Sequence, residues 1–209
     1  MIFDGHAYCF PSLTGSGGFS TPEELRRHLQ QAIATHYQPV WRAGDRATGD
    51  NTGLIDLDRW SSRDSLREAR FRAAGGGRFE WTADGEDYVK QYLLPSVNDM
   101  SYGPERLVTE MDYAGADRAL LHRTPYLGIG NAFIAECVSE FPERLLGLAH
   151  VPEWLVATEP DAAINEVVRA VREQGARGSS SCLPSSTCTA RGTPGAARAA
   201  VPSGMEWPI

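Results

Sequence analysis

Between residues 102 and 177 the sequence alternates between helix-like and strand-like patterns, and this alternation constrains the fold most strongly. Predicted helices alternate with short apolar segments, which in chain order gives 104–114, 117–122, 131–140, 145–151 and 161–174. A period of roughly 30 residues is typical of βα units, in which helices join parallel strands. The fold class expected from this pattern is therefore α/β with a parallel sheet.

The predicted helices carry local start and stop signals. Pro104 lies near the start of one helix and Gly115 lies just beyond its end. Gly175 likewise follows the helix predicted at 161–174. In that helix apolar residues recur at helical spacing, which predicts a buried face made of Ile164, Val167, Val168 and Val171.

The N-terminal segment predicts one more strand and one more helix. Met1–Phe3 is apolar and runs directly into polar residues, as expected of a buried strand with chemistry at its C-terminal end. A helix is predicted from Pro22 to about His36, with Thr21 as N-cap and Glu24 completing a capping box.

Residues 40–80 do not continue the pattern. They are rich in Arg, Asp and Gly and show no sustained period. We interpret them as a long insertion with one short helix around residues 63–71. Long loops in compact domains are often binding loops or lids, and a plain surface excursion is the alternative.

After residue 177 the alternation predicts another buried strand, and the sequence does not supply one. Of the 32 residues at 178–209, 22 are Gly, Ala, Ser, Thr or Pro. One interpretation is a disordered tail. The other, which we favour, is a shifted reading frame, because permitted codons read in another frame encode the apolar segment Leu-Gln-Phe-Leu-Pro. The expected organisation is thus an α/β unit at 1–177 and an irregular tail at 178–209.

Composition argues against several classes of protein. The net charge of −7 disfavours binding to nucleic acid or to an anionic membrane. No apolar stretch approaches the roughly 20 residues of a membrane-spanning helix, and the N-terminus lacks the basic region of a secretion signal. The cysteines are too few and too scattered for a disulfide scaffold; they are Cys9, Cys137, Cys182 and Cys188. We therefore expect a globular cytoplasmic protein.

Asp4, His6 and Tyr8 form the most informative polar pattern, because alternate residues of a strand share one face. A carboxylate and an imidazole at a strand end suit a divalent metal such as zinc. We take Asp4 and His6 as candidate metal ligands and Tyr8 as a candidate substrate-binding residue. The alternative is that Asp4 and His6 only form hydrogen bonds near the strand end. The pattern identifies no catalytic residue.

His122 and His150 end the next two predicted strands, where α/β enzymes keep their sites. Arg123 follows directly and is suited to pair with a carboxylate. These three are further candidate substrate-binding residues. The alternative for each histidine is a structural hydrogen bond, and for Arg123 it is an ion pair with an acidic loop.

Three segments carry a resemblance to a known family: IFDGHAYCFP, MDYAGADRALLHRTPYLGIGNAFIAECVSEFPERLLGLAHV and PDAAINEVVRAV. Over residues 1–177 the chain resembles the metal-dependent amidohydrolase superfamily. The most similar branch is the amidohydrolase 2 group, which includes aminocarboxymuconate-semialdehyde decarboxylase. The resemblance implies a TIM-like (β/α)8 barrel with a metal site at the C-terminal ends of its strands. This chain would hold only the N-terminal portion of that barrel.

The resemblance also assigns ligands. The family's first strand usually carries two histidines separated by one residue, and Tyr8 stands in place of the second. Some decarboxylases of the group use a carboxylate and a histidine instead, which maps onto Asp4 and His6. The family's further ligands, a histidine on a middle strand and an aspartate on the last strand, have no counterpart in this sequence.

The function implied is metal-dependent hydrolysis of an amide, ester or ring bond of a small molecule, with zinc as the expected cofactor. We expect this activity to be impaired in a truncated chain. A metal-dependent decarboxylase of small carboxylated ring compounds, with His122 and Arg123 holding the substrate, is one alternative. A non-catalytic remnant or binding protein is the other. A homo-oligomer is compatible with all three.

Overall fold

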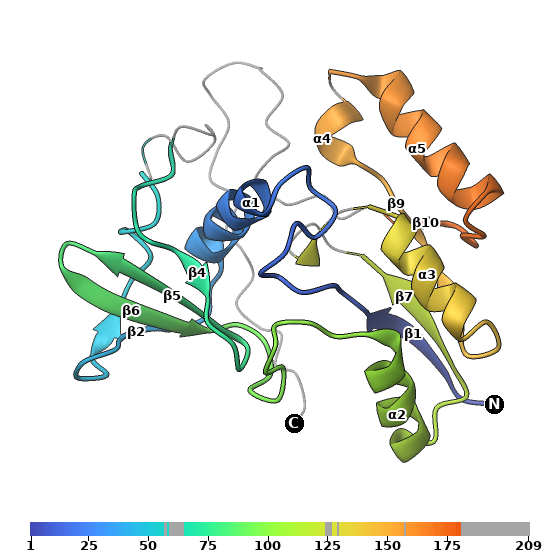
Figure 1. Ribbon diagram of the computed structural model, residues 1–209, viewed down its shortest axis with the longest axis horizontal. Coiled ribbons are helices and arrows are strands. Elements are labelled where there is room, and N and C mark those ends of the chain that lie inside the picture. The colour runs from blue at the N-terminus through green and yellow to red at the C-terminus, as the bar shows by residue number, and fades with distance from the viewer. Residues whose placement is uncertain (57, 59–64, 124–126, 129, 157, 181–209) are drawn as a thin grey trace, which may run out of the picture.

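The structure, a computed structural model, describes residues 1–180 except 57, 59–64, 124–126, 129 and 157 (Figure 1). It contains a three-stranded parallel sheet, a two-stranded parallel pair and a five-stranded antiparallel sheet. The expected α/β class is confirmed. Neither larger sheet closes on itself, so the partial barrel stays a prediction.

The parallel sheet has the order β1-β7-β8, with strands β1 (Phe3–Tyr8), β7 (Arg118–His122) and β8 (Leu145–Gly147). The prediction of a strand at Met1–Phe3 was wrong in its position, because pairing with β7 runs from Phe3 to Tyr8 and so includes the polar residues. A bulge lies between Asp4 and Ala7, where the register with β7 shifts.

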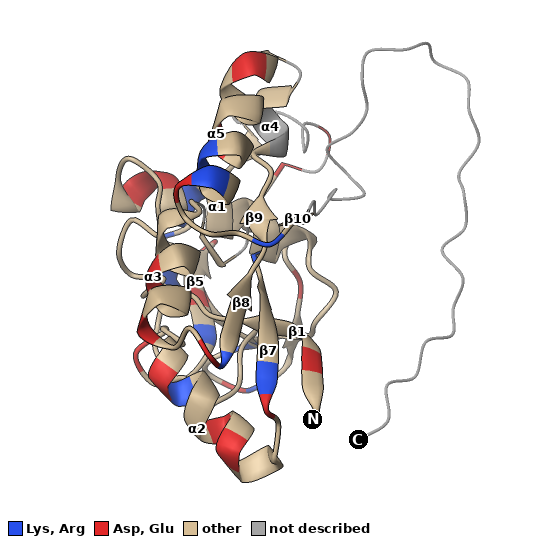
Figure 2. Cartoon of the chain, turned by 90° about the vertical axis from the view of Figure 1, so that its right-hand side faces the viewer, with Lys and Arg blue, Asp and Glu red and all other residues tan. Residues whose placement is uncertain are grey.

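Two helices cover one face of this sheet, namely α2 (Pro104–Ala114) and α3 (Ala132–Glu140). Figure 2 shows both of them on the same side of the strands. Gly115 adopts the left-handed conformation at the end of α2 (φ 72°), which confirms the predicted stop. The core between helices and sheet is a cluster of buried residues: Ala7, Cys9, Leu107, Val108, Met111, Ala119, Leu121, Ile134, Cys137 and Leu145.

The chain continues through β9 (Ala149–His150), α4 (Glu153–Val156), α5 (Pro160–Arg172) and β10 (Ser179–Ser180). The expectation that no strand follows α5 was wrong for these first residues, since β10 pairs in parallel with β9. Backbone groups alone make this pairing, and the Ala149 N–H donates to the Gly178 carbonyl at 2.8 Å. The rest of the predicted tail lies outside the described residues.

The prediction of which face of α5 is buried was wrong. Ile164, Val168 and Val171 are 60%, 38% and 45% exposed, whereas Ala163 and Ala170 are buried. The helix therefore packs through its small residues. The Glu166 carboxylate accepts a hydrogen bond from Asn131 at 2.9 Å, and this contact with the start of α3 helps to fix the rotation of α5.

The five strands of the antiparallel sheet lie between residues 40 and 91, so the segment 40–80, predicted to be an irregular insertion, contributes strands to a sheet. Its order is β3-β2-β6-β5-β4, with β2 (Val40–Arg42), β3 (Thr48–Gly49), β4 (Arg72–Ala73), β5 (Arg78–Ala83) and β6 (Glu86–Gln91). No α-helix occurs within 65–71, the described part of the helix predicted at 63–71. Asp84 and Gly85 both have positive φ, 52° and 80°, and connect β5 to β6 as a tight hairpin turn.

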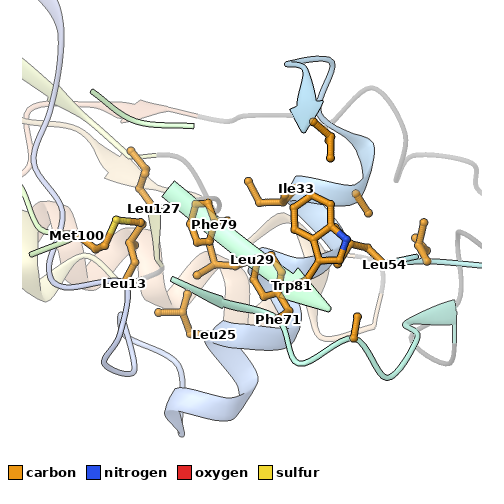
Figure 3. Close-up of a cluster of buried hydrophobic side chains, with 14 of the residues drawn as sticks. Leu13, Leu25, Leu29, Ile33, Leu54, Phe71, Phe79, Trp81, Met100 and Leu127 are labelled. Carbon is orange, nitrogen blue, oxygen red and sulfur yellow. The ribbon is translucent and has the colours of Figure 1, made fainter. Parts of the chain in front are cut away.

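The helix α1 (Pro22–Thr35) packs on this sheet. Its N-cap is confirmed, because the Thr21 hydroxyl accepts a hydrogen bond from the Glu24 N–H at 3.2 Å. Leu25, Leu29 and Ile33 from α1 lie among the buried side chains of β5, including Trp81 (Figure 3). No helix among the described residues is long and apolar enough to cross a membrane.

Lys90 on β6, the one lysine of the chain, is fully buried beneath the end of α1. Its ammonium donates to the carbonyls of Ile33 (3.0 Å) and His36 (2.7 Å) and to Asn51 Oδ1 (3.3 Å). The Ile33 carbonyl also accepts from the His36 N–H and the His36 carbonyl from Asn51 Nδ2, each at 3.3 Å, and a cation is favourable at the C-terminus of a helix. Burial nevertheless lowers the pKa of Lys90 to about 8.

Candidate functional site

Three ring-bearing side chains meet at the C-terminal ends of β1 and β7. The His6 Nε2 atom lies 2.6 Å from the Tyr8 hydroxyl. The rings of His6 and His122 have centroids 4.3 Å apart, and those of Tyr8 and His122 are 6.3 Å apart. The register explains the meeting, because Tyr8 and His122 are direct partners in the parallel pair.

This cluster of His6, Tyr8 and His122 lies on the sheet face that points away from α2 and α3. The residues between them along the strands, Ala7 and Leu121, belong to the core under those helices. Alternate residues of a strand point to opposite faces, so the ring-bearing side chains point the other way. His6 is exposed, and Tyr8 and His122 are half-buried, so the cluster is accessible to a ligand.

The tautomer of His122 follows from its hydrogen bond. Its Nε2 lies 3.0 Å from the Gly5 carbonyl oxygen. A carbonyl can only accept, so Nε2 carries the hydrogen and the neutral ring has its lone pair on Nδ1. The backbone of β1 therefore selects the tautomer of a side chain on β7.

Asp4 adopts the local arrangement that was the alternative to metal binding. Its Oδ1 accepts a hydrogen bond from the backbone N–H of His6 at 2.9 Å. This bond spans two residues at the bulge of β1. Asp4 as a metal ligand stays a prediction. Among the described residues no group of three His, Cys, Asp or Glu side chains is placed to hold a metal ion.

Arg123 is almost completely buried, with 2% of its surface exposed. Its Nε donates to the Gly128 carbonyl at 3.1 Å and its Nη2 to the Gly17 carbonyl at 3.3 Å. The guanidinium also lies over the Phe133 ring, 5.6 Å from its centroid. Burial lowers the pKa of Arg123 to about 10. The side chain joins two loops, and a substrate carboxylate could use Nε or Nη2 only by displacing these contacts.

His150 is also buried, and its environment differs from that of the His6–Tyr8–His122 cluster. Its backbone N–H donates to Asn131 Oδ1 at 2.6 Å, and its carbonyl accepts from Asn131 Nδ2 at 3.3 Å. Burial and, to a smaller extent, the nearby charge of Arg123 lower the pKa of His150 to about 4, against an opposing effect of Glu166. The ring is therefore neutral at neutral pH. Substrate binding by His150 stays a prediction.

Asn131 was not singled out from the sequence, although it lies at the start of a predicted helix. The position suggests an N-cap, but its side chain makes no capping hydrogen bond. It instead connects α3 to β9 and, through Glu166, to α5. No local sequence signal distinguishes this use from capping.

Cys9 and Cys137 are buried together between β1 and α3, which confirms Cys9 as a small core residue. The hydrogen bond between the two thiols and their burial raise the pKa of Cys9. The thiol therefore stays protonated, and a thiolate nucleophile is disfavoured.

No model of a known protein family matches this chain, and no curated protein matches it. The fold and the cluster define an α/β protein with polar ring side chains at the C-terminal ends of parallel strands. The resemblance to the amidohydrolase superfamily remains a prediction from the residues quoted above.

Proposed function

We propose that this chain is the N-terminal part of a metal-dependent hydrolase of the amidohydrolase kind, with a partial (β/α)8 barrel. Its substrate is a small molecule with an amide, ester or ring bond. The observation that carries the proposal is the meeting of His6, Tyr8 and His122 at the C-terminal ends of β1 and β7. Parallel α/β sheets hold their active sites at this end.

The cluster fits a divalent metal by the chemistry of its donors. Two imidazoles and one phenol oxygen offer nitrogen and oxygen ligands, and imidazole is a preferred ligand of zinc. His6 and His122 would hold the ion, and Asp4 would join only after giving up its bond to the His6 N–H. When bound, the metal supplies an activated water for attack on the substrate.

The residues of the chain then have defined tasks. The Gly5 carbonyl fixes His122 with its hydrogen on Nε2, so that Nδ1 is the atom able to bind a metal or accept a proton. The Tyr8 hydroxyl holds the His6 ring from the same strand. The bulge between Asp4 and Ala7 sets where these rings leave the strand.

Hydrolysis is preferred to decarboxylation because of Arg123. The decarboxylase alternative uses this guanidinium to bind a substrate carboxylate. In the structure its Nε and Nη2 already donate to the carbonyls of Gly128 and Gly17 in a buried setting. A substrate carboxylate that used these two donors would have to break hydrogen bonds of a buried charge, at a cost of about 2 kcal/mol or more.

A non-catalytic protein is the second candidate. The observation that favours it is that the described residues offer no group of three His, Cys, Asp or Glu ligands. Catalytic zinc sites ordinarily have three protein ligands and one open position. In this candidate the two histidines and Tyr8 form only hydrogen bonds and ring contacts.

Calorimetric titration of the full chain with zinc chloride tests the proposal. We expect binding of one ion, lost in His6→Ala and in His122→Ala. His28→Ala is the matched control, since His28 lies on α1 and packs against Phe19, and binding should be unchanged. Hydrolysis of p-nitrophenyl acetate is then compared with and without zinc. Binding without zinc-dependent hydrolysis favours the second candidate, and absence of binding refutes the metal site.

A further inference from the structure

Helix α5 presents an apolar stripe to solvent. Ile164, Val168 and Val171 are 60%, 38% and 45% exposed, and they lie four and three residues apart, on one side of the helix. Single exposed apolar residues are ordinary, but a contiguous set on one helix face marks an interaction surface. We call these three residues the α5 stripe.

Opposite charges flank the α5 stripe on the same side. Asp161 lies in the first turn of α5 and Arg172 in the last, and both are exposed. At 3.6 residues per turn they lie about 60° and about 80° around the helix from Ile164. Within the part of the chain that the structure describes, neither makes an ion pair. The other flank holds Val167 and the buried Ala163.

The geometry points to a second copy of this chain as the occupant, with the two α5 helices packed antiparallel about a two-fold axis. Such an axis keeps the charged flanks on one side and reverses the helix direction. Asp161 then faces Arg172 of the second copy, and this pair occurs twice. A parallel two-fold pair would place the charged flanks on opposite sides with no partner, so the charges select the antiparallel arrangement.

A single two-fold axis allows the two Asp161–Arg172 pairs and the contact between the two α5 stripes at the same time. The midpoint between positions 161 and 172 lies about one residue from the middle of the α5 stripe, a displacement of about 1.5 Å along the helix. Val168 is the stripe residue closest to this axis. A pair of helices about 20 Å long buries much less than a standard interface, so the dimer is weak and depends on concentration.

Sedimentation equilibrium of the full chain over a range of concentrations tests this inference. We expect reversible dimerisation, with the dissociation constant raised about ten-fold or more by Val168→Glu. Ala162→Glu is the matched control, because Ala162 is exposed on the same helix but lies about 160° from Ile164. It should leave the dissociation constant unchanged. Circular dichroism checks that both variants keep their helix content.

A charge exchange tests the antiparallel direction. Asp161→Arg alone should weaken the dimer, and Asp161→Arg combined with Arg172→Asp should restore it. A chain that stays monomeric at every concentration overturns the inference, as does an equal effect of Val168→Glu and Ala162→Glu. A dimer that forms normally but does not respond to the charge exchange overturns the antiparallel arrangement.

Discussion

The buried Lys90 makes stability depend on pH in a direction that the structure fixes. Burial lowers the pKa of Lys90 from 10.5 to about 8 in the folded chain. Between these values the unfolded chain binds a proton that the folded chain has released. Stability therefore rises as the pH rises through this window, and the contribution is lost as the pH falls through 8.

The magnitude follows from the two pKa values. Linkage gives a rise in the free energy of unfolding of about 1 kcal/mol between pH 7 and 9. Lys90→Met keeps the apolar stem and removes the titrating group. We expect the difference in unfolding free energy between the wild type and Lys90→Met to grow by that amount over this range. Titrating groups remote from Lys90, such as the Cys9 thiol, cancel in the difference. The pKa of His36, which burial and the charge of Lys90 lower from 6.5, lies below this pH range.

Urea unfolding of both proteins at several pH values measures this difference. A difference that stays constant or falls with pH would show that burial does not lower the pKa of Lys90. Because Lys90 is the one lysine of the chain, NMR of protein labelled with ¹³C at lysine Cε provides an independent measurement. Its single signal should titrate with a midpoint near 8 in the folded state, and a midpoint near 10.5 would show that burial has no effect.

Two further substitutions test the contacts of Asn131 with β9 and α5, and those of the loop before α3, by urea unfolding. Asn131→Ala removes the hydrogen bonds to the His150 backbone and to Glu166, and it should lower the free energy of unfolding by about 2–3 kcal/mol. A loss below about 0.5 kcal/mol would show that solvent replaces these bonds. Gly128→Ala should lower the free energy of unfolding by about 2 kcal/mol or more, because Gly128 has φ 95° and a Cβ there would collide with the Gly17 carbonyl. An unchanged stability would contradict this backbone geometry.

Local signals predicted the start of α1 and the end of α2 correctly, but they also predicted a helix at 63–71 that its described part, 65–71, does not form. Thr21 before α1 and Gly115 after α2 act on their own backbone neighbours, and both were read correctly. The antiparallel sheet was missed because two of its strands have two residues each, and because β2 pairs with the distant β6. The Asp84–Gly85 turn between alternating residues was the available signal for its central hairpin.

The candidate site could be predicted only in part. A local pattern shows which residues share one face of a strand, but it does not show which strands pair. His6 and Tyr8 share a face because they lie two residues apart on one strand, which periodicity alone shows. That His122 joins them depends on the register of β1 with β7, which no local pattern encodes. Arg123 and His150 were given the same role, but their contacts with distant loops and with Asn131 bury them.

Zinc titration followed through the ring nitrogens of ¹⁵N-labelled histidine tests whether His6 and His122 hold a metal ion. The chain has five histidines, so each can be assigned. We predict that zinc shifts the signals of His6 and His122 first, that His122 binds through Nδ1 and keeps its hydrogen on Nε2, and that His28, His36 and His150 do not respond. Signals of His6 and His122 that stay unchanged, or a first response at His28 or His36, would contradict the account.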